Sequence, residues 1–156
     1  MRWSSREPAV TATRRRSGRR HRGRELALRV LFELEGSAKD PEKTLLYQAD
    51  DMGAAADVLA FARSLVWGTL RQLDTIEASI SAASVHWRLE EIGKVERAVL
   101  RLGGYELLFE PSVPAAVVID ESVELAKAYA GGEAAGYVNG VLGHIAEQQR
   151  VGRAAQ

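Results

Sequence analysis

The sequence predicts an all-α protein, and three observations lead to that prediction. Apolar residues recur at intervals of three and four, no stretch alternates apolar and polar residues as a half-buried strand does, and aromatic residues make up only 6% of the chain. Glycine and proline separate the periodic stretches. With 156 residues the chain is long enough to bury a real core. We therefore expect a compact bundle of helices.

The composition also indicates the cellular compartment. The chain contains no cysteine, which excludes disulfides and thiolate sites and fits a reducing environment. No apolar run approaches the length that crosses a bilayer, and no hydrophobic signal segment follows the basic start. We expect a cytoplasmic protein that does not enter a membrane.

The overall charge of zero hides a strong asymmetry along the chain. Residues 1–24 hold nine arginines and one acidic residue, a net charge of +8, whereas residues 25–156 carry a net charge of −8. A basic arm on an acidic body is typical of a nucleic-acid-binding protein. Because an acidic body repels polyphosphate, we expect nucleic acid to be held where the arm joins the fold.

The first 18 residues, MRWSSREPAVTATRRRSG, are rich in Arg, Ser and Thr and lack helical periodicity. We expect a disordered basic extension there; a transit peptide has a similar composition and is the alternative. The folded domain is then expected over residues 19–150, followed by a frayed tail at residues 151–156.

A first helix is expected from Arg19 to a stop at Gly36. Phe32 lies at the boundary of its apolar face, on the side reached by Arg22 and Arg29. It is either the edge of the core or a stacking platform, since single-stranded RNA is bound by basic side chains together with aromatic rings. The apolar face itself consists of Leu26, Ala27, Val30, Leu31 and Leu34.

Two further helices are expected before the middle of the chain. The first covers Pro41–Met52, with Asp40 as its N-cap and a proline at its first position. After Gly53, one long helix is expected to run to about Ala82, and a turn follows at Ser84–Arg88.

The stretch from Ile92 to Phe109 is apolar around most of its circumference, which predicts a helix that other elements enclose. Glu96 and Glu106 fall within the apolar arc. Buried carboxylates need partners, so each is either a satisfied structural residue or the rim of a contact site. The pair Gly103–Gly104 weakens the helix, which indicates that another helix crosses closely there.

Two helices complete the expected bundle. Pro111 and Pro114 separate the first of them from the central helix, and a Gly131–Gly132 pair separates it from the last. Tyr137 lies near the start of the last helix, where free amide groups and the positive end of the helix dipole favour a phosphate. The buried face of that helix is expected to be Val138, Val141, Leu142 and Ile145.

No catalytic constellation is visible in the sequence. His21, His86 and His144 stand in different segments without metal-ligand spacing. Phosphate-binding glycine loops and a serine nucleophile elbow are absent, and neighbouring acids point apart on a helix. We expect a protein that is not an enzyme and that uses neither a metal nor a cofactor.

Four stretches carry a resemblance to a known family. RRHRGRELALRVLF, VERAVLRLGGYEL, VPAAVVIDESVELAK and YVNGVLG occur in this order between about Arg19 and Glu147, and together they resemble the NusB family of transcription antitermination proteins. The resemblance implies two three-helix halves packed as one all-α domain. It also implies binding of single-stranded boxA in nascent ribosomal RNA jointly with the NusE ribosomal protein, and through it an indirect association with the RNA polymerase antitermination complex. A homodimer is possible, since family members occur as monomers and dimers.

The resemblance further implies which residues make these contacts. Phe32 stands where the family usually has Tyr, so it can stack but offers no hydroxyl, and Glu133 stands where Asp is familiar. The implied NusE-facing residues are Glu121, Glu124 and Lys127. The implied RNA-binding residues are Arg19, Arg20, Arg22, Arg24, Phe32, Glu96, Glu133, Tyr137, Asn139 and Gly140.

Two alternatives remain from the sequence. A NusB-like accessory domain of an RNA cytosine methyltransferase would come with a cofactor domain and catalytic cysteines, which these residues lack. A helix-turn-helix DNA-binding protein fits the basic arm, but no later helix is polar enough to read bases. For the favoured RNA-binding protein, four neutralised phosphates would give a log–log salt slope of roughly −3. We expect replacement of Arg20, Arg22 and Arg24 by Ala to weaken RNA binding without unfolding the body.

Overall fold

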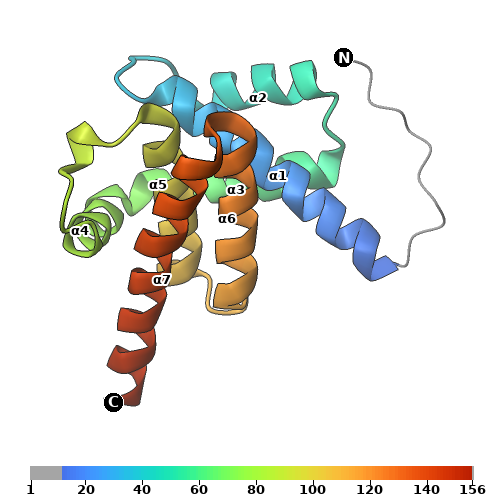
Figure 1. The fold of residues 1–156 in the computed structure, drawn as a ribbon. Coiled ribbons are helices and arrows are strands. Elements are labelled where there is room, and N and C mark those ends of the chain that lie inside the picture. The colour runs from blue at the N-terminus through green and yellow to red at the C-terminus, as the bar shows by residue number, and fades with distance from the viewer. Residues whose placement is uncertain (1–11, 156) are drawn as a thin grey trace.

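The protein folds as a bundle of α-helices, seen here in a computed structural model that describes residues 12–155, with side chains from residue 18 onward (Figure 1). This part of the chain contains no strand, which confirms the predicted all-α class. Its elements are α1 (Ala12–Leu34), α2 (Pro41–Met52), α3 (Ala56–Arg71), α4 (Leu73–Ala83), the 3-10 turn η1 (Leu89–Glu91), α5 (Lys94–Phe109), α6 (Ala115–Ala130) and α7 (Gly132–Ala154).

Helix α5 is the centre of the bundle, as its apolar circumference predicts. It packs against α1, α3, α4, α6 and α7. Helices α1, α2 and α3 contact one another and form the first half, while α6 and α7 with α5 form the second, against which the short α4 packs. At Gly103 an added Cβ would lie 2.7 Å from Ser122 Oγ of α6 and 2.8 Å from Leu142 Cδ1 of α7. The close crossing expected at the glycine pair is therefore present.

Helix α1 begins earlier than the sequence indicated. Residues 12–18, expected in a disordered extension, belong to the helix, while the rest of that expectation concerns residues 1–11, which lie outside the described part of the chain. The predicted apolar face of α1 packs into the core. The helix ends at Leu34, and Gly36 follows in a left-handed conformation with φ of 70°, which glycine adopts without strain.

The caps of α2 are those expected. Asp40 accepts a hydrogen bond from the Lys43 amide at 2.9 Å, and Gly53 ends the helix with φ of 62°. The single long helix expected after Gly53 is wrong, because the chain bends at Gln72 (φ −108°, ψ 18°) and divides into α3 and α4. Helices α3 and α4 both pack on α5, but α3 also packs on α1 and α4 on α7, and the bend lets each segment reach its own second neighbour.

The last two helices follow the predicted pattern except at the C-terminal end. Gly131 (φ 98°) separates α6 from α7, and all four residues of the expected α7 face are buried. Helix α7 continues to Ala154, so residues 151–154, expected to fray, are helical. Figure 1 shows the C-terminal part of α7 extending beyond the other helices. In the described part of the chain no helix is both long and apolar enough to span a membrane.

Candidate nucleic-acid interface

The basic side chains between Arg19 and Arg24 of α1 contact different neighbours instead of forming one strip. Arg19 Nη1 lies 2.7 Å from Asp57 Oδ2 of α3, and the Arg20 guanidinium lies 4.1 Å from the centre of the Phe61 ring. Arg22 donates to the Met52 carbonyl at 2.8 Å. Successive side chains of a helix point about 100° apart, so a run of arginines cannot share one face.

Arg24 is a core residue. It is 5% exposed, and its Nε donates to both carboxylate oxygens of Glu106, at 3.0 and 3.1 Å. Glu106 is 2% exposed; burial raises the pKa of its carboxyl, and the Arg24 guanidinium opposes this shift. The implied RNA contact of Arg24 is therefore corrected, because its guanidinium is enclosed and already paired. Of the two alternatives given for Glu106, the structural one is therefore correct: its buried carboxylate is paired with Arg24.

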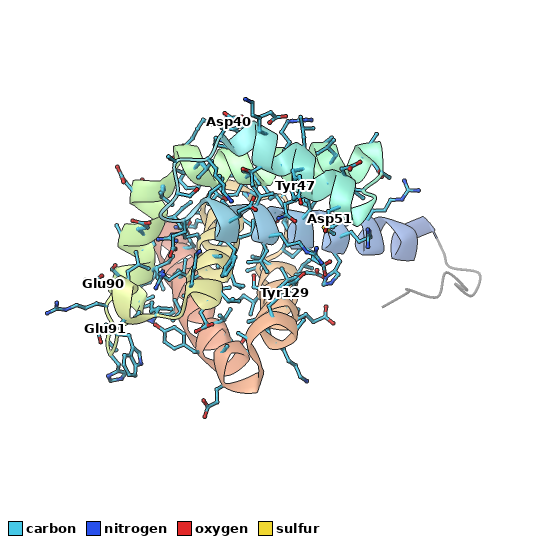
Figure 2. All side chains as sticks on the ribbon, turned by 90° about the horizontal axis from the view of Figure 1, so that it is seen from above. Asp40, Tyr47, Asp51, Glu90, Glu91 and Tyr129 are labelled. Atoms are coloured by element: carbon cyan, nitrogen blue, oxygen red, sulfur yellow. The ribbon has the colours of Figure 1, made fainter. Side chains whose placement is uncertain are left out.

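Phe32 lies near the opposite end of α1 from the arginines. Its side chain is 38% exposed, and Lys94 Nζ of α5 lies 4.3 Å from the centre of its ring. Twelve residues separate Phe32 from Arg20, a distance along the helix of about 18 Å. In Figure 2 the N-terminal part of α1 points to one side of the molecule, while Glu90 and Glu91 lie at the other side, toward which α1 runs. The arginines and the ring thus occupy two separate regions.

A hollow of about 370 Å³ lies at the N-terminal end of α5. Tyr137 of α7 and Trp87 of the turn before η1 contribute rings to its wall, and Glu96 and Glu133 contribute carboxylates. The carboxylate of Glu96 folds back over the start of its own helix. The walls also include Glu91, Ile92, Gly93, Ala130 and Ala134.

Polar contacts fix the aromatic walls of this hollow. The Tyr137 hydroxyl hydrogen-bonds to Ser84 Oγ, and Ser84 Oγ donates to the Trp87 carbonyl at 3.1 Å. A Cβ at Gly93 would lie 2.0 Å from Glu96 Oε2, so the backbone must lack a side chain there for the carboxylate to approach. Through Ser84, the turn that carries Trp87 is linked to Tyr137 of α7.

Phe32 and Tyr137 approach the same end of α5 from two sides. Lys94, which covers Phe32, directly follows Gly93, which lines the hollow with Tyr137. The expected meeting of the two rings at one part of the surface is consistent with this arrangement. The expectation that these rings lie beside the arginine cluster is wrong, because several turns of α1 separate the arginines from Phe32.

The other implied site residues are spread over two helices. Asn139 is exposed but follows Tyr137 by two positions, which on a helix points it to a different face, whereas Gly140 is closer to the Tyr137 side. Lys127 of α6 is exposed. Glu121 is half-buried and faces inward to His21 of α1, so it is not freely available to a partner. The hydrogen bond that the His21 ring donates to the Glu121 carboxylate raises the pKa of His21.

Two side chains in this region were missed by reasoning from the sequence. Trp87 is 53% exposed at the mouth of the hollow, and Lys94 is the cation over Phe32. The sequence carries no clear signal for Trp87, because a single exposed aromatic in a turn is ordinary on a protein surface. Lys94 is the first residue of α5, a position that follows only once the start of the helix is known.

The chemistry of the hollow suits a base more than a phosphate. Glu91, Glu96 and Glu133 place three carboxylates at its walls, and carboxylates accept hydrogen bonds from base amino groups but repel phosphate. The rings offer stacking surfaces. Two exposed cations are next in the chain to residues of the hollow: Lys94 follows Gly93, and Arg88 follows Trp87, with its Nε 3.8 Å from Glu91 Oε1. A nucleotide could place its base in the hollow and its backbone along these cations.

Comparison with known proteins shows which family the chain belongs to. The model of the NusB family matches residues 21–147. A transcription antitermination protein NusB of Sorangium cellulosum is 43% identical over 131 residues, which cover 83% of this chain and 93% of that protein. The NusB of Heliobacterium modesticaldum is 38% identical over 134 residues, or 86% of this chain, and the match spans 65% of that relative's length.

Solved structures give the same family. The structure of T. maritima NusB superposes with a TM-score of 0.76 at 36% identity, covering 82% of this chain and 90% of that one. A crystal structure of the antitermination factors NusB and NusE in complex with dsRNA contains a chain that superposes with a TM-score of 0.77 at 30% identity, covering 84% of this chain and 98% of that one.

Proposed function

The chain belongs to the NusB family, and from this premise we propose that it is a non-catalytic transcription antitermination factor that binds single-stranded boxA of nascent ribosomal RNA together with the NusE ribosomal protein. The observation that carries the proposal is the convergence of three rings, Phe32, Trp87 and Tyr137, at the N-terminal end of α5. A related NusB chain occurs in a complex with NusE and RNA, which supports both partners.

The RNA-binding surface is defined by Phe32, Trp87, Lys94 and Tyr137 with the carboxylates of the hollow. Stacking of a base on an aromatic ring stabilises such complexes by about 1–3 kcal/mol per base. The carboxylates supply selectivity, since they accept hydrogen bonds only from bases that present amino or imino groups. Arg19, Arg20 and Arg22 lie farther along α1 and would hold the backbone of a longer RNA.

The protein partner is expected on the second half of the bundle. Glu124 and Lys127 are exposed on α6 and leave charged groups for a surface of mixed sign. Helix α5 offers little to a partner because most of its residues are buried. An association with RNA polymerase would then be indirect, through the NusE-containing complex.

A fluorescence-anisotropy titration tests this function. Labelled boxA RNA is titrated with the protein alone and with purified NusE, against a scrambled RNA and a DNA duplex. We expect preference for boxA that NusE strengthens. With Arg19, Arg20 and Arg22 of α1 and with Arg88 and Lys94 beside the hollow as phosphate contacts, the log–log salt slope of that binding should be about −3.5. Equal affinity for boxA, scrambled RNA and duplex DNA, unchanged by NusE, would contradict the proposal.

A further inference from the structure

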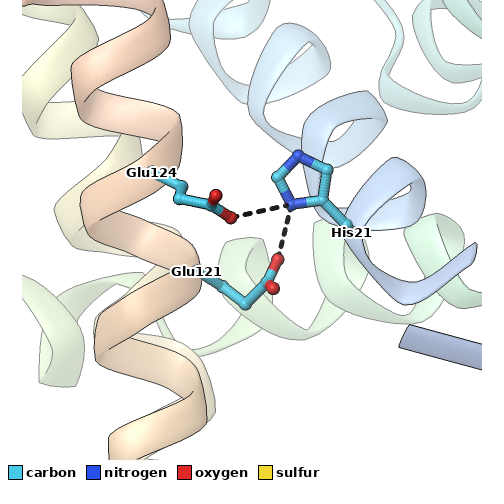
Figure 3. A group of neighbouring side chains, drawn as sticks. All are labelled: His21, Glu121 and Glu124. Atoms are coloured by element: carbon cyan, nitrogen blue, oxygen red, sulfur yellow. Dashed lines mark hydrogen bonds and ion pairs between the residues drawn. The ribbon is translucent and has the colours of Figure 1, made fainter. Parts of the chain in front are cut away.

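His21, Glu121 and Glu124 converge from two helices that are distant in the sequence (Figure 3). His21 Nδ1 of α1 lies 2.6 Å from Glu121 Oε2 and 3.9 Å from Glu124 Oε2, both of α6. One ligand atom from each residue lies within 4.8 Å of the other two. We propose that these three side chains form a binding site for a divalent transition-metal ion of the Zn²⁺ type that clips α1 to α6.

The positions on the helices suit a shared ion. Glu121 and Glu124 are three residues apart on α6 and so lie on the same face. His21 approaches that face from α1, with its Nδ1 directed between the two carboxylates, as Figure 3 shows. Helices α1 and α6 both pack against α5, so the bundle itself holds the three side chains opposite one another.

The distances are close to those of a metal site. Zn²⁺ bound at about 2.0–2.2 Å from each ligand atom holds tetrahedral ligand atoms about 3.4 Å apart. The two measured distances from His21 Nδ1 fall on either side of this separation. Each therefore changes by less than about 1 Å on metal binding, a shift that rotation of the carboxylate groups supplies without movement of the helices.

Exposure and charge also favour a cation. The side chain of Glu121 is 20% exposed and that of Glu124 is 70% exposed, so the site opens to solvent on one side and leaves room for water as a fourth ligand. With neutral imidazole the trio carries two negative charges. Of the cations on this part of α1, Arg24 is paired with Glu106, and Arg20 is stacked on Phe61.

The donor set selects the class of ion. One imidazole nitrogen and two carboxylate oxygens suit Zn²⁺ and related transition ions, whereas Ca²⁺ and Mg²⁺ prefer sites made of oxygen only. The histidine is 100 residues from Glu121, which is why inspection of sequence spacing gave no metal site. The inference does not depend on the proposed function, although the clip would fix the part of α1 that carries Arg19, Arg20 and Arg22.

Isothermal titration calorimetry with ZnSO₄ alone tests the site, using tag-free full-length protein at about pH 8, where free imidazole is neutral. We expect one saturable equivalent of Zn²⁺ per chain and a higher Tm in its presence. His21→Ala should abolish that binding. Glu124→Gln should weaken it at least about tenfold, and it is not expected to disturb folding because the side chain is exposed. His144→Ala, which removes an exposed histidine of α7, should bind like the wild type.

Absence of saturable binding to the wild-type protein would overturn the proposal. So would equal affinity in the wild type and Glu124→Gln, because the ion would then be bound elsewhere. Circular dichroism of each variant separates lost ligands from lost fold. A Co²⁺ titration gives an independent readout, since visible absorption bands that are present in the wild type and absent in His21→Ala report coordination by these residues.

Discussion

At the scale of single residues, arginines of identical chemistry have opposite roles in α1. Arg19 and Arg20 are exposed, whereas Arg24 is enclosed with Glu106. The difference arises from the face of the helix on which each falls and from a carboxylate 82 residues away. The sequence does show that Glu106 needs a partner. It does not show which arginine supplies it, because that depends on how α1 crosses α5.

Arg24→Met is expected to lower the free energy of unfolding by about 3–5 kcal/mol, because it leaves the buried Glu106 carboxylate without its countercharge. Urea denaturation followed by circular dichroism measures this. The double variant Arg24→Met/Glu106→Leu removes both charges and should recover most of the loss. If Arg24→Met were as stable as the wild type, the buried pair would not have the role assigned to it. The replacement of Arg24 in the triple variant considered from the sequence is therefore expected to destabilise the folded body, unlike replacement of Arg20 and Arg22.

Trp87→Ala is expected to weaken boxA RNA binding about 5- to 100-fold, through loss of stacking on one base. Fluorescence anisotropy with wild-type and variant protein measures the change. Tyr47→Ala is a matched control, since it removes an aromatic ring of α2 that is 69% exposed and lies away from the hollow (Figure 2). Equal losses in the two variants would indicate that the hollow has no special part in binding.

At the scale of helices, an ion-pair cluster joins the end of α1 to α5. Glu35, which follows α1, accepts hydrogen bonds from Arg97 and Arg101 of α5, and Arg101 also pairs with Glu77 of α4 at 2.9 Å. The hydrogen bond from Arg97 lowers the pKa of Glu35 to about 2, against burial, which raises it, and Arg101 adds to the decrease. The cluster thus connects the two halves of the bundle.

The lowered pKa predicts how stability depends on pH. Because the pKa of Glu35 is lower in the folded than in the unfolded chain, its stabilisation is present above the unfolded value of about 4.5 and is lost as pH falls toward about 2. The difference in unfolding free energy between wild type and Glu35→Gln should be about 2–3 kcal/mol at neutral pH and should vanish across that window. Urea titrations at a series of pH values measure it; a difference independent of pH would contradict the assignment.

The close crossing at Gly103 predicts opposite effects for two glycine substitutions. Gly103→Ala should lower the free energy of unfolding by about 1–3 kcal/mol, since its methyl group would overlap Ser122 and Leu142. Gly136→Ala should raise it by up to about 1 kcal/mol, because that glycine is within α7 with no atom near its missing side chain. Thermal and urea unfolding of both variants provide the comparison. A stabilised Gly103→Ala would show that the helices are not packed this closely.

Helix boundaries are predicted correctly from the sequence where a capping residue, a proline or a glycine marks them. Asp40 with the proline after it gives the start of α2, and Gly131 gives the boundary of α6 and α7. The bend at Gln72 carries no such signal, since glutamine is a good helix former. The bend follows instead from tertiary packing, because α3 also contacts α1 and α4 also contacts α7. Likewise Trp87 is recognisable as a wall of the hollow only after Tyr137 is known to lie beside the same turn.

At the scale of the whole molecule, the charge asymmetry of the sequence is partly cancelled by folding. Arg19 pairs with Asp57, Arg24 with Glu106, and His21 contacts Glu121, so acids of other helices balance part of the positive charge among the described side chains of α1. The candidate interface is instead a surface of rings and carboxylates with cations at its border. Selectivity at the N-terminal end of α5 then comes from base contacts, and the phosphate contacts of α1 position the strand.

Ultraviolet crosslinking of the protein to boxA RNA, followed by mass spectrometry of the crosslinked peptides, tests most directly where the RNA lies. The account predicts that the aromatic residues Phe32, Trp87 and Tyr137 are crosslinked, and that excess unlabelled boxA RNA competes for these crosslinks. Competable crosslinks confined to α2, α3 or the C-terminal part of α7, with none at the three rings, would contradict it.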